Sequence, residues 1–233
     1  MAYTVEQLDT GFWCIFDEMV RCFLFEGPKQ ALLVDTGLGG DLAAFCRTLT
    51  EKPIQLVLTH CDRDHVGAIQ QFDAPMMHPA EYALYNFRGG KPANLQPLWD
   101  GQILDIGSFR FEVIHIPGHT PGSIALLEPE KRFLLTGDSA QSGSIYMFDE
   151  GRDLSALLMS IRRLQTIRTR FDVIYGSHGD QVNTAEILDQ LETLIEDVLQ
   201  GNLPEIVPAP PHLQPDITCY KKGNAQLLLR ASK

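Results

Sequence analysis

The chain has 233 residues, 44% of them hydrophobic and 21% charged, and a formal net charge of −11. This composition is ordinary for a soluble globular protein with one sizeable core. The anionic surface disfavours nucleic acid as a partner, because phosphate backbones are repelled by it. Since no run of about 18 apolar residues occurs, we expect no membrane span.

The N-terminal residues and the cysteine pattern both predict a cytoplasmic location. The first residues, Met1 to Glu6, lack a basic stretch followed by an apolar one, so we expect no secretory signal. The five cysteines are odd in number and form no Cys-x-x-Cys pair. We therefore expect reduced, packed thiols rather than a disulfide framework or a zinc ribbon.

In the first part of the chain, apolar runs rich in branched and aromatic residues predict strands, and a face with Leu42, Phe45 and Leu49 predicts a helix that Pro53 ends. The predicted strands are 12–16, 20–25, 31–34, 54–58 and 75–78. Further helices are predicted near 67–71 and over 79–87, and the glycine- and proline-rich segment 88–101 is predicted to be a loop.

The second part continues with strands and then helices. The predicted strands are 103–106, 109–116, 124–127, 133–135 and 171–175. The predicted helices are 153–169 and 184–200, with Thr184 as the N-cap of the second. We expect an irregular tail over 201–217 and a closing hairpin from 217–220 and 226–229. The order of elements favours an α/β fold of two packed sheets with helices outside, in a single domain over 1–233 with its core at about 12–200.

The strongest chemical signal is the run His60-Cys-Asp62-Arg-Asp64-His65, which follows a predicted buried strand. Imidazole nitrogens and carboxylate oxygens are ligands for zinc, and also for iron and manganese. A tight loop aims His60 and Asp62 to one side and Asp64 and His65 to the other, so the run is able to serve two metals. The alternative is a charged surface loop whose histidines are incidental.

Three further strand ends carry single metal-competent residues: His119 within Pro117–Gly122, Asp138 after Gly137, and His178 within Gly176–Gly179. Each is a weak signal alone, because loop histidines are common and an aspartate such as Asp138 is more often a helix or turn cap. Their joint occurrence at the ends of apolar strands predicts one site, where Asp138 has two oxygens to bridge two cations.

With these motifs the chain resembles the metallo-β-lactamase superfamily over about residues 12–180. The matching segments are Val34-Asp-Thr-Gly37, Leu58-Thr-His-Cys-Asp-Arg-Asp-His-Val-Gly67, Pro117-Gly-His-Thr-Pro-Gly-Ser123, Leu135-Thr-Gly-Asp138 and Tyr175-Gly-Ser-His-Gly179. The resemblance implies a four-layer αβ/βα sandwich of two mixed β-sheets flanked by helices. It also implies a dinuclear metal site at one rim of the sandwich.

The resemblance further implies a division of the ligands. The first metal takes His60, Asp62 and His119; the second takes Asp64, His65 and His178; Asp138 bridges both. Asp35 is expected to brace the His60 loop through hydrogen bonds.

One residue departs from the family pattern. The usual run is His-x-His-x-Asp-His, and here Asp62 stands in place of the second histidine. A carboxylate adds negative charge and hardness, which raises tolerance for iron or manganese beside the zinc expected first.

The resemblance implies a metal-dependent hydrolase in which two divalent ions activate water against a small-molecule ester, lactone or thioester. Asp64 is the expected catalytic residue, orienting the water and carrying its proton. A glyoxalase II-like thioesterase is less favoured, because no long C-terminal helical domain follows, and Asp138 in place of a cysteine weakens the likeness to true β-lactamases. The alternatives are an iron-dependent oxidoreductase of the persulfide dioxygenase type, a phosphodiesterase, and a non-catalytic metal-binding module.

The expected partner is therefore a small-molecule substrate, with no nucleic acid and no membrane. A homodimer is left open, because the apolar N-terminal strands and the proline-rich tail are both suited to one. Cys61 is expected to point away from the metals, His115 to serve the core or brace the site, and His78 to stand at a strand end. Nothing places Tyr146, Phe148 or Arg88 in a substrate pocket.

Overall fold

The structure is a computed structural model that describes residues 3–91, 93–202 and 204–230. The strands are β1 Thr4–Asp9, β2 Phe12–Asp17, β3 Val20–Glu26, β4 Ala31–Val34, β5 Ile54–Val57, β6 Met76–Met77, β7 Gln96–Pro97, β8 Ile103–Asp105, β9 Arg110–His115, β10 Ile124–Glu128, β11 Phe133–Leu135, β12 Gly143–Tyr146, β13 Val173–Tyr175, β14 Glu205–Val207, β15 Ile217–Lys222 and β16 Ala225–Arg230. The α-helices are α1 Leu42–Arg47, α2 Tyr82–Phe87, α3 Leu154–Thr166 and α4 Glu186–Leu199.

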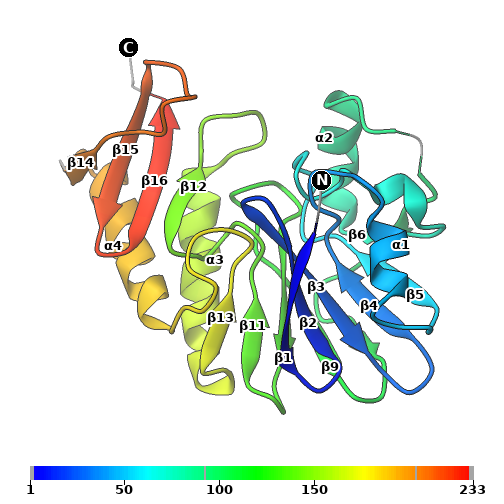
Figure 1. Ribbon diagram of the computed structural model, residues 1–233. Helices are drawn as coiled ribbons and strands as arrows, with labels where there is room; N and C mark the ends of the chain where they lie inside the picture. The colour runs from blue at the N-terminus through cyan, green and yellow to red at the C-terminus, as the bar shows by residue number, and fades with distance from the viewer. Residues whose placement is uncertain (1–2, 92, 203, 231–233) are drawn as a thin grey trace.

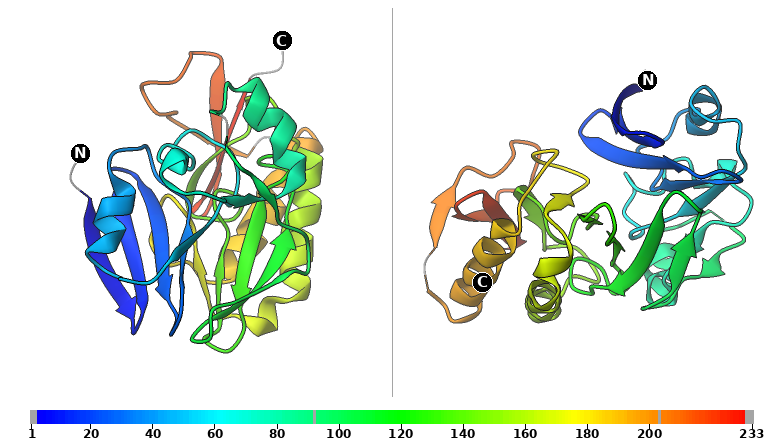
Figure 2. Two further views of the ribbon diagram at one scale, coloured as in Figure 1. Left: turned by 90° about the vertical axis from the view of Figure 1, so that its right-hand side faces the viewer. Right: turned by 90° about the horizontal axis from the view of Figure 1, so that it is seen from below.

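Two sheets face each other at the centre of the molecule. One is seven-stranded in the order β1 to β7, and the other is five-stranded in the order β13-β11-β10-β9-β8. Helices α1 and α2 lie outside the first sheet, and α3 and α4 lie outside the second, as the views in Figures 1 and 2 show. This arrangement confirms the predicted α/β sandwich of mixed sheets flanked by helices.

Separate hydrophobic clusters hold these layers together. Between the sheets, Phe12, Phe25 and Phe133 stack with neighbouring apolar side chains. A second cluster joins the outer face of the first sheet to α1 and α2, and a third joins the other sheet to α3 and α4. Burial of apolar surface on both faces explains why the strands read as continuous apolar runs in the sequence.

Parallel strand pairs bring loops that are distant in sequence to the same edge. In the first sheet β4 and β5 are parallel with Val34 opposite Val57, and in the second β11 and β13 are parallel with Leu135 opposite Tyr175. Strands that run in parallel end at the same edge of a sheet. The loops that follow these four strands therefore meet at one rim of the sandwich.

The strands missed by the sequence analysis are polar or pair with distant partners. β1 is largely exposed and lies at the edge of its sheet, so it carries no apolar run. The tail predicted to be irregular contains β14, and the segment predicted to be a loop contains β7. β12 pairs with β16 about eighty residues later, and with β14 and β15 these strands form a third, four-stranded sheet.

Several boundaries also need correction. The helix predicted over 153–169 ends at Thr166 and gives way to a separate turn of 3₁₀ helix at Arg168–Arg170. Helix α4 begins at Glu186 with Ala185 in the cap position, so the prediction of Thr184 as N-cap was wrong.

No helix among the described residues is long and apolar enough to cross a membrane. The assignment of 1–233 to one domain stays a prediction, and residues 1–2, 92, 203 and 231–233 lie outside the described residues.

The aromatic cluster between the sheets yields a stability prediction. Phe25 is fully buried and contacts Phe12, Phe109 and Phe111, so we expect Phe25→Ala to lower the free energy of unfolding by about 3–5 kcal/mol. Urea denaturation measures this change. Phe87→Ala is the matched control, because Phe87 is 70% exposed and its loss should cost less than about 0.5 kcal/mol. Equal losses in the two variants would contradict a core role for Phe25.

Candidate metal centre

Seven histidines and aspartates meet at the rim where the loops after β5, β9, β11 and β13 converge. They are His60, Asp62, Asp64, His65, His119, Asp138 and His178, and they form two groups that satisfy the spacing of metal ligands. The packed strands and the cluster between the sheets fix the loop ends, and rigid supports of this kind are what a precise site needs.

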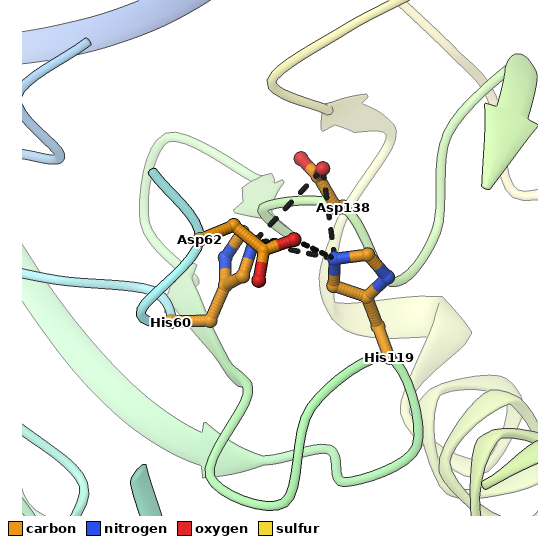
Figure 3. A group of neighbouring side chains, drawn as sticks. All are labelled: His60, Asp62, His119 and Asp138. Carbon is orange, nitrogen blue, oxygen red and sulfur yellow. Dashed lines mark hydrogen bonds and ion pairs between the residues drawn. The ribbon is translucent and has the colours of Figure 1, made fainter. Parts of the chain in front are cut away.

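The first group consists of His60, Asp62, His119 and Asp138, whose polar atoms point toward one another (Figure 3). The Nε2 atoms of His60 and His119 lie 3.2 Å apart. Asp62 Oδ2 is 3.6 Å from the first of these nitrogens and 3.3 Å from the second. Two imidazole nitrogens and a carboxylate oxygen thus surround one small space.

The second group consists of Asp64, His65 and His178. His178 Nε2 lies 3.1 Å from Asp64 Oδ2, and His65 Nε2 lies 3.9 Å from the same oxygen. Asp138 stands between the groups, since its Oδ2 is 3.7 Å from His119 Nε2 and 3.4 Å from His178 Nε2. The geometry brings together all seven residues singled out in the sequence, and their division between two metals stays a prediction.

Buried polar atoms without partners show that this donor set fits cations. His65 Nε2 and Asp138 Oδ1 are buried and have no hydrogen-bond partner among the described residues, although they lie 3.3 Å apart. Buried polar groups are normally paired, and leaving one unpaired costs about 1–3 kcal/mol. Divalent cations bound by imidazole nitrogens and carboxylate oxygens would satisfy both atoms, which zinc and iron are able to do.

Asp35, the residue expected to brace the His60 loop, makes three hydrogen bonds to it. Its Oδ1 accepts from the backbone N–H of Thr59 at 2.7 Å, and its Oδ2 accepts from Thr59 Oγ1 at 2.7 Å. The same Oδ2 lies 2.8 Å from His65 Nδ1. A carboxylate on Nδ1 holds a histidine in the tautomer that leaves Nε2 free for a metal.

Arg21 positions the His178 loop, and the sequence analysis missed it. The buried guanidinium donates to the backbone carbonyls of Gly176 at 3.1 Å, Gly179 at 2.9 Å and Asp180 at 3.2 Å, and also to that of His178. A charged residue inside the apolar run of β3 was the available signal. Its partners are backbone atoms more than 150 residues away, which no local pattern reveals.

Glu81 joins two of the ligand loops and was also missed. It is fully buried, and its two carboxylate oxygens accept from the backbone N–H groups of Cys61 at 2.8 Å and Gly122 at 2.6 Å. Cys61 lies in the His60–His65 run and Gly122 in the loop that carries His119. One buried side chain therefore fixes the distance between the two halves of the first group.

Glycine allows the His119 loop to pack closely against α3. Gly118 has a φ of 140°, a conformation that side chains rarely adopt, and its α-carbon lies against the backbone of Leu157. Any β-carbon at this position would overlap that backbone. The glycine beside His119 in the sequence motif thus reflects a close approach of loop and helix.

Electrostatics differ between the two groups. Burial, and next the Arg152 guanidinium, lower the pKa of His119 to about 4. Burial acts in the same direction on His178, but the Asp138 carboxylate and the hydrogen bond to Asp64 raise its pKa to about 10. Burial would raise the pKa of Asp138, yet His178 and His65 hold it well below its usual range. Near neutral pH, His119 is ready to bind a metal, whereas His178 holds a proton.

The remaining candidates lie outside the two groups. Cys61 packs in the hydrophobic cluster beneath α2. His78 stacks on His115 with ring centroids 3.9 Å apart and accepts from the N–H of Ala80. Arg88, which the sequence did not place, donates to Asp62 Oδ1.

The chain is similar to known proteins in sequence and in fold. The family model described as the metallo-beta-lactamase superfamily matches residues 15–198. The hydroxyacylglutathione hydrolase GloC of Haemophilus influenzae is 32% identical over 178 residues, covering 67% of this chain and 83% of that protein. The acyl-coenzyme A thioesterase MBLAC2 of Bos taurus is 29% identical over 165 residues, covering 53% of this chain and 59% of that protein. A solved structure of TTHA1623 in a di-iron-bound form is 28% identical, with a TM-score of 0.63, covering 76% of this chain and 98% of that one.

The unequal pKa values predict that the two groups take up metal differently as pH changes. The pKa of His178 is raised to about 10 in the metal-free protein, so Zn²⁺ must displace a proton near neutral pH. We expect the affinity of the second group to rise about tenfold per pH unit between about pH 7 and pH 9 for each proton displaced. His119, with a pKa of about 4, adds no such dependence to the first group in this range.

Zinc titration against a competing chromophoric chelator measures both affinities across this range. Burial would lower the pKa of His65, but Asp138 and Asp35 raise it well above its usual range, so His178→Gln should weaken the pH dependence without abolishing it. His212→Gln, a change of an exposed histidine in the tail, should leave the dependence intact. Identical pH profiles for the two zinc ions would count against this assignment of protonation states.

Proposed function

The chain belongs to the metallo-β-lactamase superfamily, and we propose that it hydrolyses small-molecule thioesters at a dinuclear metal centre. It is an enzyme of the hydrolase type found among its relatives. The observation that carries the proposal is the position of Asp138 between two groups of ligands, because a carboxylate shared in this way holds two cations close together.

In this proposal His60, Asp62 and His119 would hold the first cation, Asp64, His65 and His178 would hold the second, and Asp138 would be shared between them. Bound there, two divalent cations would supply Lewis acidity that makes water nucleophilic and polarises the carbonyl of the substrate. Zinc is the first expectation for both positions. The hardness of Asp62 and the di-iron form of a relative support iron as the alternative.

Asp64 is the proposed catalytic residue. Its side chain is 29% exposed, against 9% for Asp138 and 16% for Asp62, so it is the carboxylate of the centre most open to incoming water. Burial would raise the pKa of Asp64, but His65 and His178 lower it, which keeps the group ionised at neutral pH. An ionised carboxylate in this place orients the attacking water and accepts its proton.

A thioester is the favoured substrate class for a chemical reason and a comparative one. A thiol has a pKa of about 8.5, so a thiolate leaves the tetrahedral intermediate with little need for a proton donor. Asp64 then has only to remove a proton from water and release it to solvent or to the departing sulfur. The names of the relatives from Haemophilus influenzae and Bos taurus, an acylglutathione hydrolase and an acyl-coenzyme A thioesterase, support the same class.

These comparisons raise the weight of a thioesterase. The sequence alone favoured an ester, lactone or thioester as the substrate and made a glyoxalase II-like thioesterase the less favoured case. The described C-terminal segment instead folds into the third sheet, which packs on α4. A relative named as a hydroxyacylglutathione hydrolase aligns over 83% of its own length, which supports thioester cleavage by this chain.

An iron-dependent oxidoreductase is the second candidate, because a relative is known in a di-iron-bound form. Iron content in the purified protein, together with oxygen uptake on a thiol persulfide, would favour it.

A cytoplasmic location fits the five free, buried cysteines, which lie within the described residues. The proposed partner is the small-molecule substrate itself, and a homodimer stays a prediction.

A substrate panel tests the proposal together with Asp64→Asn. We expect acyl-glutathione or acyl-coenzyme A thioesters to be hydrolysed faster than matched oxygen esters, lactones and phosphodiesters, and a chelator to abolish this activity. Asp64→Asn keeps a ligand oxygen but removes the base, so kcat should fall about 10²–10⁴-fold while metal content, measured by mass spectrometry, is retained.

Asp73→Asn is the matched control, because Asp73 is an exposed aspartate in the loop before β6. It should leave kcat unchanged. Full turnover by metal-loaded Asp64→Asn would refute the role of Asp64, and a preference for phosphodiesters over thioesters would refute the substrate class.

A further inference from the structure

The carboxylate of Asp62 lies between two guanidinium groups. Arg152 Nη2 is 2.5 Å from Asp62 Oδ2, and Arg88 donates to Asp62 Oδ1. The side chain of Arg152 is only 3% exposed and that of Asp62 is 16% exposed. A buried arginine in contact with a buried aspartate costs much more to leave unpaired than a surface ion pair does.

The oxygen that Arg152 contacts is the one that faces the first group of ligands. Asp62 Oδ2 also lies 3.3 Å from His119 Nε2 and 3.6 Å from His60 Nε2. Arg152 donates in addition to the backbone carbonyl of His119. A single guanidinium therefore holds both the carboxylate and the loop of its neighbouring ligand.

The start of α3 fixes Arg152 in this place. The next residue, Asp153, caps the helix by accepting from the N–H of Ala156 at 2.9 Å. The backbone N–H of Asp153 donates to the carbonyl of Gly118 at 2.8 Å, which ties the helix start to the His119 loop. Arg152 thus lies in the loop directly before a capped helix, and this helix start is tied to the His119 loop.

Charge explains why such an arginine is needed. Asp62 stands where the matching family run has a histidine, so it adds one negative charge to the first group. Arg152 adds one positive charge at the oxygen that faces the ligands and offsets it, while Arg88 contacts the other oxygen of Asp62. An aspartate with an arginine then carries the same total charge as a neutral imidazole, and it still offers one oxygen to a cation.

We propose that Asp62 and Arg152 act as one unit that replaces an imidazole ligand, with Arg152 as a positioning residue that aims Asp62 Oδ2 at the first metal. The inference rests on the dinuclear centre of the proposed function. It predicts that neither residue works without the other, so that restoring the histidine at position 62 harms the site unless Arg152 is also removed.

The first test removes the arginine. Zn²⁺ titration of metal-free protein, followed by equilibrium dialysis, should give two bound ions in the wild type. In Arg152→Met the first ion should bind at least about tenfold more weakly and the second should bind unchanged. Arg152→Lys should recover part of the loss, because it restores the charge without the planar fork of donors.

Arg163→Met is the matched control. Arg163 lies on α3 and likewise contacts an aspartate, Asp100, and a histidine backbone carbonyl, that of His115, but outside the metal centre. Its loss should leave both zinc affinities as in the wild type. Retained binding of the second ion in Arg152→Met shows that the variant has folded.

The second test exchanges the ligand. Asp62→His alone should lose first-site affinity, because Arg152 loses its carboxylate partner and keeps only the carbonyl of His119, so its charge is left uncompensated beside the imidazoles. The double variant Asp62→His with Arg152→Met should bind the first Zn²⁺ at least about tenfold more tightly than Asp62→His. Cobalt substitution gives a readout independent of turnover, since the visible spectrum of bound Co²⁺ reports its coordination.

Two results would overturn the inference: unchanged first-site affinity in Arg152→Met, or wild-type affinity in Asp62→His with Arg152 present. If the wild type binds no metal at either group, the dinuclear centre of the proposed function fails instead. If the wild type binds two ions and the Asp62→His variant matches it, only the pairing of Asp62 with Arg152 fails.

Discussion

The carboxylate of Asp138 faces four imidazole nitrogens, and the rest of the centre is arranged to keep them there. Its oxygens lie 3.3–3.9 Å from Nε2 of His60, His65, His119 and His178. So many ionisable groups in a buried space are tolerable only when charges are paired or neutralised. Asp35, Glu81 and Arg21 have no direct contact with that carboxylate, yet each holds one or more of the loops that surround it.

The sequence predicted the site best where a buried apolar strand is followed directly by a residue that is able to bind a metal. Strand β11 is buried along its whole length and β5 over its second half. Both appear as short apolar runs, so the metal-competent residues that follow them could be predicted. Parallel pairing then makes the ends of such strands converge, which is why separate motifs predicted a single site. All seven residues that meet at the rim were singled out in this way, and their role as metal ligands stays a prediction.

The parts that escaped prediction depend on contacts between distant residues. β1 and β14 are exposed edge strands without an apolar pattern, and β12 is stabilised by a partner far along the chain. Arg152 was missed because its role appears only when the start of α3 is placed beside the Asp62 loop. The sequence did identify Asp62 as unusual, and the structure supplies two arginines around it as the physical context for that difference.

The hydrogen bonds from Arg21 to the His178 loop have a consequence for the order of folding. Arg21 belongs to β3 of the first sheet, and the loop it holds follows β13 of the second, more than 150 residues later. Contacts of such long sequence separation form late, because closing a long loop costs entropy before any contact repays it. The complete set of ligands therefore exists only after the two sheets have docked. A cation held by all seven residues would therefore bind only after this assembly, and its binding would stabilise the docked sheets.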